Sequence, residues 1–174
     1  MTAPGTVLKT PRLTLRPARW DDLEALHAVL SDPRATRWWS TPAHETLDQT
    51  RAWLEAMIAS PHELAEDFVV ELEGRVVGKA GFYRLPEIGF ILNPDVHGRG
   101  LGHEAAHAVV AHVFAVRALD RLTADADPRN SASIAVLTRL GFRETGRAER
   151  TMKVGNEWVD SVRFALNRAD FASF

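Results

Sequence analysis

Apolar residues recur along this chain with two different periods. Spacings of three and four residues place apolar side chains on one face of a helix, whereas a period of two, or a short run rich in β-branched and aromatic residues, is typical of a strand. The first pattern predicts helices from Asp21 to about Pro33, over residues 45–59, from the end of the segment NPDVHGRGLG to about Val116, and over residues 130–140. The second pattern predicts strands over residues 12–17, 68–72, 75–83, 87–92, 121–126, 142–154 and 157–166.

The order of these elements predicts the fold class. Residues 68–72 and 75–83 are separated by Glu73-Gly74, a pair typical of a hairpin turn, and Gly141 stands where many helices end. The predicted order is a strand, two helices, three antiparallel strands, a helix, a strand, a helix and two final strands. We therefore expect an α/β fold with a mixed, mostly antiparallel central sheet flanked by helices. No repeat or Gly/Ser linker divides the sequence, so we expect one domain over residues 1–174.

Composition narrows the setting. The chain has 174 residues, of which 45% are hydrophobic and 25% are charged, the balance of an ordinary globular domain. A formal net charge of −2 gives no reason to expect a nucleic acid or an anionic membrane as a partner. No apolar run is long enough to span a bilayer, and the first residues lack the apolar core of a signal peptide. The absence of cysteine excludes disulfides and a cysteine nucleophile and fits a reducing cytoplasm, where we expect the protein to act.

The most informative segment is the glycine-rich turn His97-Gly98-Arg99-Gly100-Leu101-Gly102, which lies between a predicted strand and a predicted helix. Glycine lets backbone N–H groups approach a ligand closely because no Cβ intervenes. The first turn of the following helix adds unpaired N–H groups and the positive end of the helix dipole. These features predict a pyrophosphate site, to which Arg99 adds a cation, and an ordinary glycine-rich connector is the alternative.

Motifs distinguish the pyrophosphate ligands that such a turn could bind. The phosphate loop of nucleoside triphosphatases needs G-x-x-x-x-G-K-[ST], which this chain lacks. The dinucleotide motif G-x-G-x-x-G begins at Gly98 and Gly100 but reaches His103 where its last glycine belongs, although Asp125 stands at a distance that suits a ribose contact. The predicted antiparallel hairpin upstream also disagrees with a dinucleotide-binding unit. Coenzyme A is the third ligand of this kind.

Several segments resemble the GNAT acetyltransferase superfamily, whose motif [Q/R]-x-x-G-x-[G/A] lies between a strand and a helix. Gly100 and Gly102 match this motif, and His97 replaces the Gln or Arg of its variable first position. The segments LKTPRLTLRPARWDDLEAL and IGFILNPDVHGRGLGHEA are similar to the opening and to the cofactor loop of the branch that contains ribosomal-protein N-terminal acetyltransferases (RimJ/RimL-like). The segments NSASIAVLTRLGF and WVDSVRFAL resemble a helix and the final strand of that branch, so the resemblance covers nearly the whole chain.

The resemblance implies a fold, a reaction and a set of binding residues. Acetyl-CoA would lie in a cleft between central strands and donate its acetyl group to a primary amine, either a protein N-terminal α-amine or a small-molecule amine. Backbone groups of Ile91 and Leu92 would pair with the pantetheine arm. Asn130, which also suits a helix N-cap, would bond pantetheine, and Ser133 would lie near the thioester sulfur. The pyrophosphate would be held by backbone amides of Gly98, Arg99, Gly100, Leu101, Gly102 and His103.

The reaction itself requires further groups. A free alkyl amine is protonated at pH 7, so a base must take its proton directly or through water. The family often uses an acidic residue on the strand that carries the cofactor, here Glu87, and a solvated charge at a strand start is the alternative. A backbone N–H near Leu92 is expected to stabilise the oxyanion. Many relatives use a late tyrosine to protonate the thiolate, but the only tyrosine here is Tyr83, which makes Ser133 the candidate.

Trp38 and Trp39 are unusual residues for a polar connector. Because they follow the first predicted helix, we expect them to wall the amine pocket, with burial in the core as the alternative. The sequence does not select among a protein α-amine, a polyamine, an amino acid and an aminoglycoside. Relatives are often dimers, which leaves a homodimer open.

Two rival functions also remain open. His103-Glu104-Ala105-Ala106-His107 spells H-E-x-x-H on a predicted helix, the arrangement with which zinc peptidases hold a metal ion and a general base. The preceding glycines place His103 in the first helical turn and no third ligand stands out, so we expect no metal site. The second rival is a CoA-binding regulatory module without catalysis.

Overall fold

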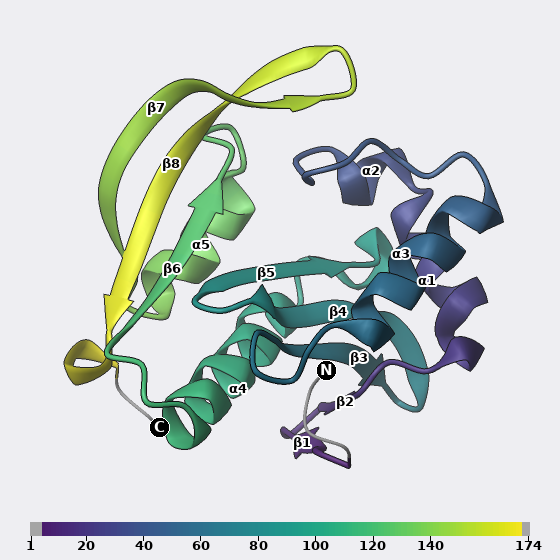
Figure 1. The fold of residues 1–174 in the computed structure, drawn as a ribbon, viewed down its shortest axis with the longest axis horizontal. Helices are drawn as coiled ribbons and strands as arrows, with labels where there is room; N and C mark the ends of the chain where they lie inside the picture. The colour runs from purple at the N-terminus through teal and green to yellow at the C-terminus, as the bar shows by residue number, and fades with distance from the viewer. Residues whose placement is uncertain (1–4, 172–174) are drawn as a thin grey trace.

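An open eight-stranded sheet flanked by helices forms the framework of the protein (Figure 1). The computed structural model describes residues 5–171. The strands are β1 (Leu8–Lys9), β2 (Leu13–Arg16), β3 (Glu66–Leu72), β4 (Arg75–Arg84), β5 (Glu87–Leu92), β6 (Arg121–Ala126), β7 (Arg143–Val154) and β8 (Glu157–Asn167). The helices are α1 (Leu23–Leu30), α2 (Pro33–Thr36), α3 (Leu47–Ala59), α4 (Leu101–Val116) and α5 (Ser131–Arg139). Short 3-10 turns occupy Trp20–Asp22, Pro94–Val96 and Arg168–Asp170.

The predicted α/β architecture is confirmed, and each predicted helix and strand is present with ends shifted by a few residues. Two short elements were missed. Strand β1 has two residues and pairs with β2, with Leu8 opposite Leu15. Two residues are too few for an alternating pattern to be recognised in the sequence. Helix α2 begins where the sequence predicted a stop, because Asp32 accepts a hydrogen bond from Arg34 N and Pro33 occupies the first helical position.

The ends of the longer helices follow local rules. Helix α3 begins with a capping box, in which the Thr46 hydroxyl accepts from Gln49 N and the Gln49 side chain accepts from Thr46 N. Helix α5 ends as predicted at Gly141, whose φ of 97° lies in the left-handed region. Gly141 N donates to Thr138 O and Phe142 N donates to Leu137 O, the two bonds of a Schellman motif.

One strand pair sets the shape of the sheet. The strand order is β1-β2-β3-β4-β5-β6-β8-β7, and every neighbouring pair is antiparallel except β5 and β6. These two parallel strands share one register position, Glu87 opposite Thr123, supported by a 3.0 Å bond from Thr123 N to Pro86 O. Beyond that point they diverge, as Figure 1 shows. The sheet therefore consists of two parts. The first contains β1 to β5, the second contains β6, β8 and β7, and the parts separate toward the carboxyl ends of β5 and β6.

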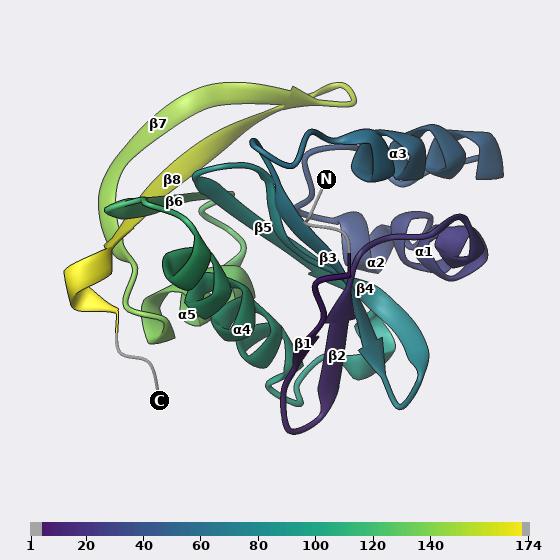
Figure 2. The same cartoon turned by 60° about the horizontal axis from the view of Figure 1, so that its bottom comes forward.

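Helix α4 holds the two parts together. Its buried residues Val109, Val110 and Val113 are 0% exposed and belong to one apolar cluster with residues from both parts of the sheet, including Phe68 of β3 and Phe164 of β8. Helices α1 and α3 form a smaller cluster with Val69 on the opposite face. Figure 2 shows α4 and α5 beneath the diverging strands and α1, α2 and α3 on the other side. The described residues contain no helix with the length and apolar character needed to cross a membrane.

Candidate active site

A larger and a smaller cavity meet where β5 and β6 diverge. The larger cavity has a volume of about 740 Å³ and lies between α3, the strand ends and the β7–β8 hairpin. The smaller cavity has a volume of about 490 Å³ and extends to the first turns of α4 and α5. Both are lined by the same residues at their junction: Arg37, Trp38, Trp39, Ile88, Gly89, Asp125 and Ala126. A molecule in the smaller cavity can therefore meet one in the larger cavity between the two strands.

The glycine-rich turn forms one end of the smaller cavity. Gly98 and Gly100 both have φ of 76°, a left-handed conformation that favours glycine, and Gly100 directly precedes α4. A Cβ placed on Gly98 or Gly102 would meet no heavy atom within 4 Å, so the backbone there faces open space. The start of this 16-residue helix offers unpaired backbone amides, the kind of group that binds pyrophosphate at helix N-termini.

A brace from the turn between β1 and β2 supports the glycine-rich turn. Glu104 in the first turn of α4 accepts hydrogen bonds from the Thr10 hydroxyl at 2.6 Å and from Arg12 N at 2.9 Å. The Arg12 guanidinium donates to Glu104 Oε2 at 2.7 Å and to Arg99 O at 2.8 Å. The contribution of Arg99 to this arrangement is its carbonyl, and its side chain is not among those that line the cavity.

The contacts of Glu104 also bear on the alternative that His103-Glu104-x-x-His107 is a zinc-peptidase motif. Thr10 and Arg12 occupy both oxygens of Glu104 and hold its pKa below the ordinary value, although burial opposes the shift, so this carboxylate is not placed as a general base. His107 packs against Phe171, with ring centroids 5.3 Å apart. Within residues 5–171, no group of three or more His, Cys, Asp or Glu side chains could hold a metal ion. A zinc peptidase is not favoured.

The backbone of β5 presents alternate residues to β4 and to the cavities. Asn93 N donates to Val77 O at 2.7 Å, and pairs in an antiparallel ladder alternate between hydrogen-bonded and non-hydrogen-bonded. By this alternation Ile91 faces Lys79, whereas the N–H and C=O of Leu92 are turned away from β4. The register thus favours Leu92 over Ile91 as a backbone partner for a ligand, whereas the sequence led us to expect both.

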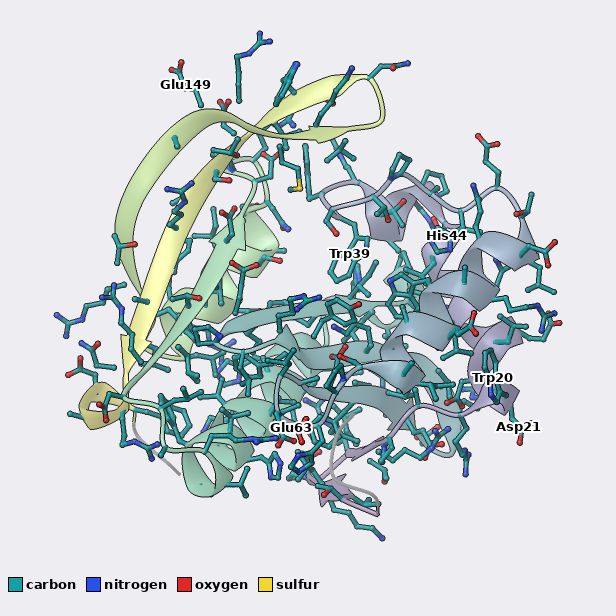
Figure 3. The ribbon with its side chains drawn as sticks, viewed as in Figure 1. Trp20, Asp21, Trp39, His44, Glu63 and Glu149 are labelled. Atoms are coloured by element: carbon teal, nitrogen blue, oxygen red, sulfur yellow. The ribbon has the colours of Figure 1, made fainter. Side chains whose placement is uncertain are left out.

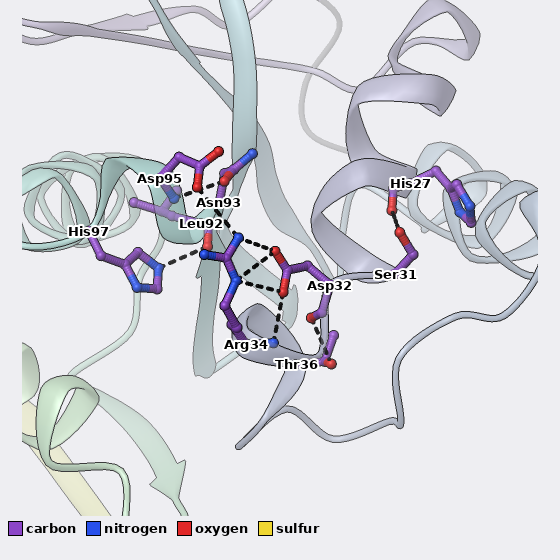
Figure 4. A network of polar contacts seen from close by, with 9 residues as sticks. All are labelled: His27, Ser31, Asp32, Arg34, Thr36, Leu92, Asn93, Asp95 and His97. Atoms are coloured by element: carbon purple, nitrogen blue, oxygen red, sulfur yellow. Dashed lines mark hydrogen bonds and ion pairs between the residues drawn. The ribbon is translucent and has the colours of Figure 1, made fainter.

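His97 agrees with this orientation. Its Nε2 lies 2.9 Å from Leu92 O and donates to that carbonyl, which ties the glycine-rich turn to the end of β5 (Figure 4). In the same network Arg34 joins α2 to the turn, with Nη2 at 2.7 Å from Asp32 Oδ2 and at 3.4 Å from Asp95 Oδ1. The variable first position of the motif is therefore occupied by a residue that fixes the geometry of the loop.

Asn130 and Ser133 lie together at the start of α5, and both line the smaller cavity. Asn130 caps the helix by accepting from Ser133 N at 3.1 Å, as its sequence position suggested. Its Nδ2 also donates to Ser133 Oγ at 2.9 Å. Because the Ser133 oxygen accepts that bond, its own proton is available for a group in the cavity.

Glu87 lies at the start of β5 and lines the larger cavity. Among the described residues its carboxylate has no hydrogen-bonding partner. Partial removal from water raises the pKa of Glu87, the nearby negative charge of Asp125 raises it further, and Arg163 opposes both. Arg163 is itself 3.8 Å from Asp125, a loose contact. This arrangement holds the Glu87 carboxyl in a state in which it accepts a proton more readily than an ordinary glutamate.

The floor of the larger cavity contains a buried ion pair. Lys79 Nζ lies 2.8 Å from Asp67 Oδ1, and the two residues are 3% and 6% exposed. Burial raises the pKa of Asp67, and the Lys79 charge opposes this shift. Trp39 lies over the same region, with its ring centroid 5.9 Å from Lys79 Nζ, and it points into the space between α2 and β5 (Figure 3).

Trp38 and Trp39 are both half-buried and line both cavities, so the sequence pattern identified a shared wall. Their surroundings differ. Two guanidinium groups, those of Arg37 and Arg129, lie over the ring of Trp38, whereas Trp39 packs above Gly89. Sequence reasoning missed Arg37, Lys79 and Arg129, because isolated basic residues in unrelated segments give no motif. It noted Asp125 for a ribose contact, but the mostly antiparallel sheet is not a dinucleotide-binding unit, and Asp125 instead lies at the junction of the cavities.

A sheet that opens between two parallel strands, with unpaired amides at the start of the neighbouring helix, is typical of CoA-dependent acyltransferases. Comparisons with known proteins agree with this class. Residues 12–143 match the family model described as an acetyltransferase (GNAT) domain. The chain is 28% identical over 166 residues to the uncharacterized N-acetyltransferase YnaD of Bacillus subtilis, covering 91% of this chain and 95% of that protein. It is 26% identical over 162 residues to spermidine N(1)-acetyltransferase of Escherichia coli, covering 87% and 84%.

Solved structures show the same fold. A GNAT-family acetyltransferase from Bacillus anthracis superposes with a TM-score of 0.81 at 29% identity, covering 93% of this chain and 98% of that one. RimL, a ribosomal alpha-N-protein acetyltransferase in complex with coenzyme A, gives a TM-score of 0.83 at 19% identity, covering 93% and 98%. The protein belongs to the GNAT acetyltransferase family, and its acetyl donor is acetyl-CoA. The open space around Gly98 and Gly102 at the helix start fits the pyrophosphate of that donor.

The conformation of Gly100 generates a test. An L-residue in the left-handed region costs about 1–2 kcal/mol, so in Gly100→Ala the turn should relax away from this conformation when CoA is absent. Restoring the conformation on binding should lower CoA affinity roughly tenfold without unfolding the protein. Calorimetric titration with CoA measures the affinity. Gly146→Ala is the control, because Gly146 lies on β7 with open space around the added methyl. Equal CoA affinities for the two variants would show that the turn is only a connector.

Proposed function

We propose that this N-acetyltransferase moves the acetyl group of acetyl-CoA directly to a primary amine bound in the larger cavity, within a complex that holds both reactants. The observation that carries the proposal is the continuity of the two cavities at the β5–β6 divergence. The anion site lies at the far end of one cavity, and an unpartnered carboxylate, Glu87, lines the other. A regulatory module that only binds CoA has no need of this second cavity.

The proposed binding residues act mainly through the backbone. Acetyl-CoA supplies an activated acyl carbon with a thiolate leaving group. The amides from Gly98 to His103 hold its pyrophosphate, and Leu92 pairs with its pantetheine arm. Asn130 contacts the same arm from α5, on the opposite side of the smaller cavity.

The proposed catalytic groups are Glu87, Leu92 and Ser133. Glu87 takes a proton from the incoming ammonium, directly or through water, so that the amine can attack. The N–H of Leu92 donates to the acetyl oxygen as negative charge develops there. Ser133 donates its free proton toward the departing sulfur, aided by its place at the start of α5, where the helix dipole favours negative charge.

The lining of the larger cavity suggests which amines could be acetylated. Trp39, the Lys79–Asp67 floor and the carboxylates of the larger cavity offer an aromatic wall and charges of both signs. Similar proteins are named for a small polyamine, spermidine, and for the alanine of a ribosomal protein. We propose a small-molecule amine or a protein N-terminal α-amine as the acceptor. An acetyl-CoA consumption screen over polyamines, amino acids, aminoglycosides and N-terminal peptides tests it, and no turnover with any amine would contradict the function.

Glu87→Gln tests the base. The variant keeps the shape and hydrogen bonding of the side chain but accepts no proton, so the rate at neutral pH should fall about 100- to 10,000-fold. CoA affinity should stay unchanged, because the proposed CoA contacts lie elsewhere. Glu149→Gln is the matched control, since Glu149 lies on the outer side of β7 and lines neither cavity (Figure 3). A Glu87→Gln rate within about threefold of wild type would remove Glu87 from the mechanism.

The neighbours of Glu87 predict opposite shifts in the pH–rate profile. Glu87 must be deprotonated to act, so activity should fall as pH drops through its raised pKa. Asp125→Asn removes the negative neighbour and should move this acidic limb to lower pH. Arg163→Gln removes the positive neighbour and should move it to higher pH. The measurement is kcat at saturating amine between about pH 4 and 9. Shifts in the same direction would mean that another group titrates.

A further inference from the structure

Two cations lie over the ring of Trp38. The guanidinium carbons of Arg37 and Arg129 each lie 4.6 Å from the centroid of its ring. Both distances are within the range of cation–π contacts. With guanidinium groups over the ring, Trp38 is a fixed wall rather than a free platform for a substrate. We call Arg37, Trp38 and Arg129 the Trp38 bridge.

Arg129 is fixed more firmly than a surface arginine requires. Its Nε and Nη2 donate to the two oxygens of Asp127 at 2.9 and 2.7 Å, a bidentate pair, and Asp127 is buried. Its Nη1 donates to Glu157 Oε1 at 3.0 Å. Asp127 follows β6 and Glu157 begins β8. Residues of two elements therefore fix the orientation of the Arg129 guanidinium group that contacts Trp38.

The bridge crosses the opening in the sheet. Trp38 follows α2, which packs against β5 through Ala35 and Ile91. Arg129 lies beyond the end of β6. The contact between Trp38 and Arg129 therefore links the β5 side of the opening to the β6 side, beyond the point where the two strands stop pairing. Trp38 lines both cavities, so the bridge lies beside the passage through which the acetyl group and the amine must meet.

We propose that Arg129 is a positioning residue for acetyl transfer: through Trp38 it closes the β5–β6 opening beside the acetyl group, which retains the pantetheine arm and keeps water from the thioester. This inference rests on the proposed function. Without the bridge, water competes with the amine for the acyl carbon. Attack by water breaks the carbon–sulfur bond, releases acetate and passes a proton to the CoA thiolate. An enclosed reaction space suppresses such side reactions.

The test compares Trp38→Ala and Arg129→Ala with wild type by two readouts. The first is the ratio of amine-independent CoA thiol release to acetyl transfer, measured with the best amine from the screen. The second is the dissociation rate of CoA itself, measured by stopped flow without any amine. Loss of one cation–π contact corresponds to roughly a fivefold effect, so each variant should raise both quantities about fivefold or more. The double variant should match Trp38→Ala, because Arg129 acts only through the ring that this variant removes.

Conservative variants separate positioning from general loss of structure. Trp38→Phe keeps an aromatic ring in contact with the guanidinium groups and should keep both quantities near the wild-type values. Arg129→Lys keeps the charge but loses the planar, bidentate geometry, so it should resemble Arg129→Ala. Arg147→Ala is the matched control, because Arg147 pairs with Glu144 at 2.7 Å on β7 and lines neither cavity.

The outcomes are distinguishable. If wild type acetylates no amine, the proposed function fails, and the CoA dissociation rates still test whether the bridge retains the cofactor. If Arg129→Ala leaves both quantities at the level of Arg147→Ala, the bridge has no role and the inference is wrong. If Trp38→Phe behaves like Trp38→Ala, the stacking contact is not the cause, which overturns it equally.

Discussion

The divergence of β5 and β6 is the constraint on which the rest of the molecule depends. A parallel pair with one register position leaves backbone groups of β5 without a strand partner, and buried backbone groups need partners. His97 donates to the carbonyl of Leu92, which keeps a second lone pair for a strand-like cofactor arm, and the N–H of Leu92 stays open to the cleft. The two parts of the sheet stay together because α4 packs beneath both. The proposed cofactor site thus lies where the sheet is incomplete.

The sequence predicted the elements well because their signals are local. The capping residues of α3, the turn at Glu73-Gly74 and the end of α5 at Gly141 each depend on neighbours a few positions away. The glycine-rich turn likewise stands out from the sequence as a candidate anion site, and the family resemblance named the donor. The sequence could not separate Ile91 from Leu92 as backbone partners of a ligand, because which backbone groups face a cleft depends on strand register, and register is a property of the sheet.

The charges of the larger cavity could not be predicted for a related reason. Lys79 meets Asp67 across two strands, and Arg129 meets Glu157 across 28 positions of sequence. Most carboxylates there are matched by a basic group, whereas Glu87 is left without a hydrogen-bonding partner among the described residues. A cavity in which most carboxylates have a partner and Glu87 has none provides a polar environment without neutralising the proposed base. Such pairing is visible only after the strands are aligned.

The brace between Glu104 and Arg12 has a consequence for folding. These residues are 92 positions apart, so their contact carries the entropy cost of closing a long loop. The glycine-rich turn contains two left-handed glycines, Gly98 and Gly100, and the contact with Arg12 supports its shape. Because that cost must be met before the contact stabilises the turn, we expect the turn to take its final shape late in folding, when the N-terminal segment joins the sheet. A fragment that carries the motif but lacks the first two strands would contain every residue of the turn and would not retain its geometry.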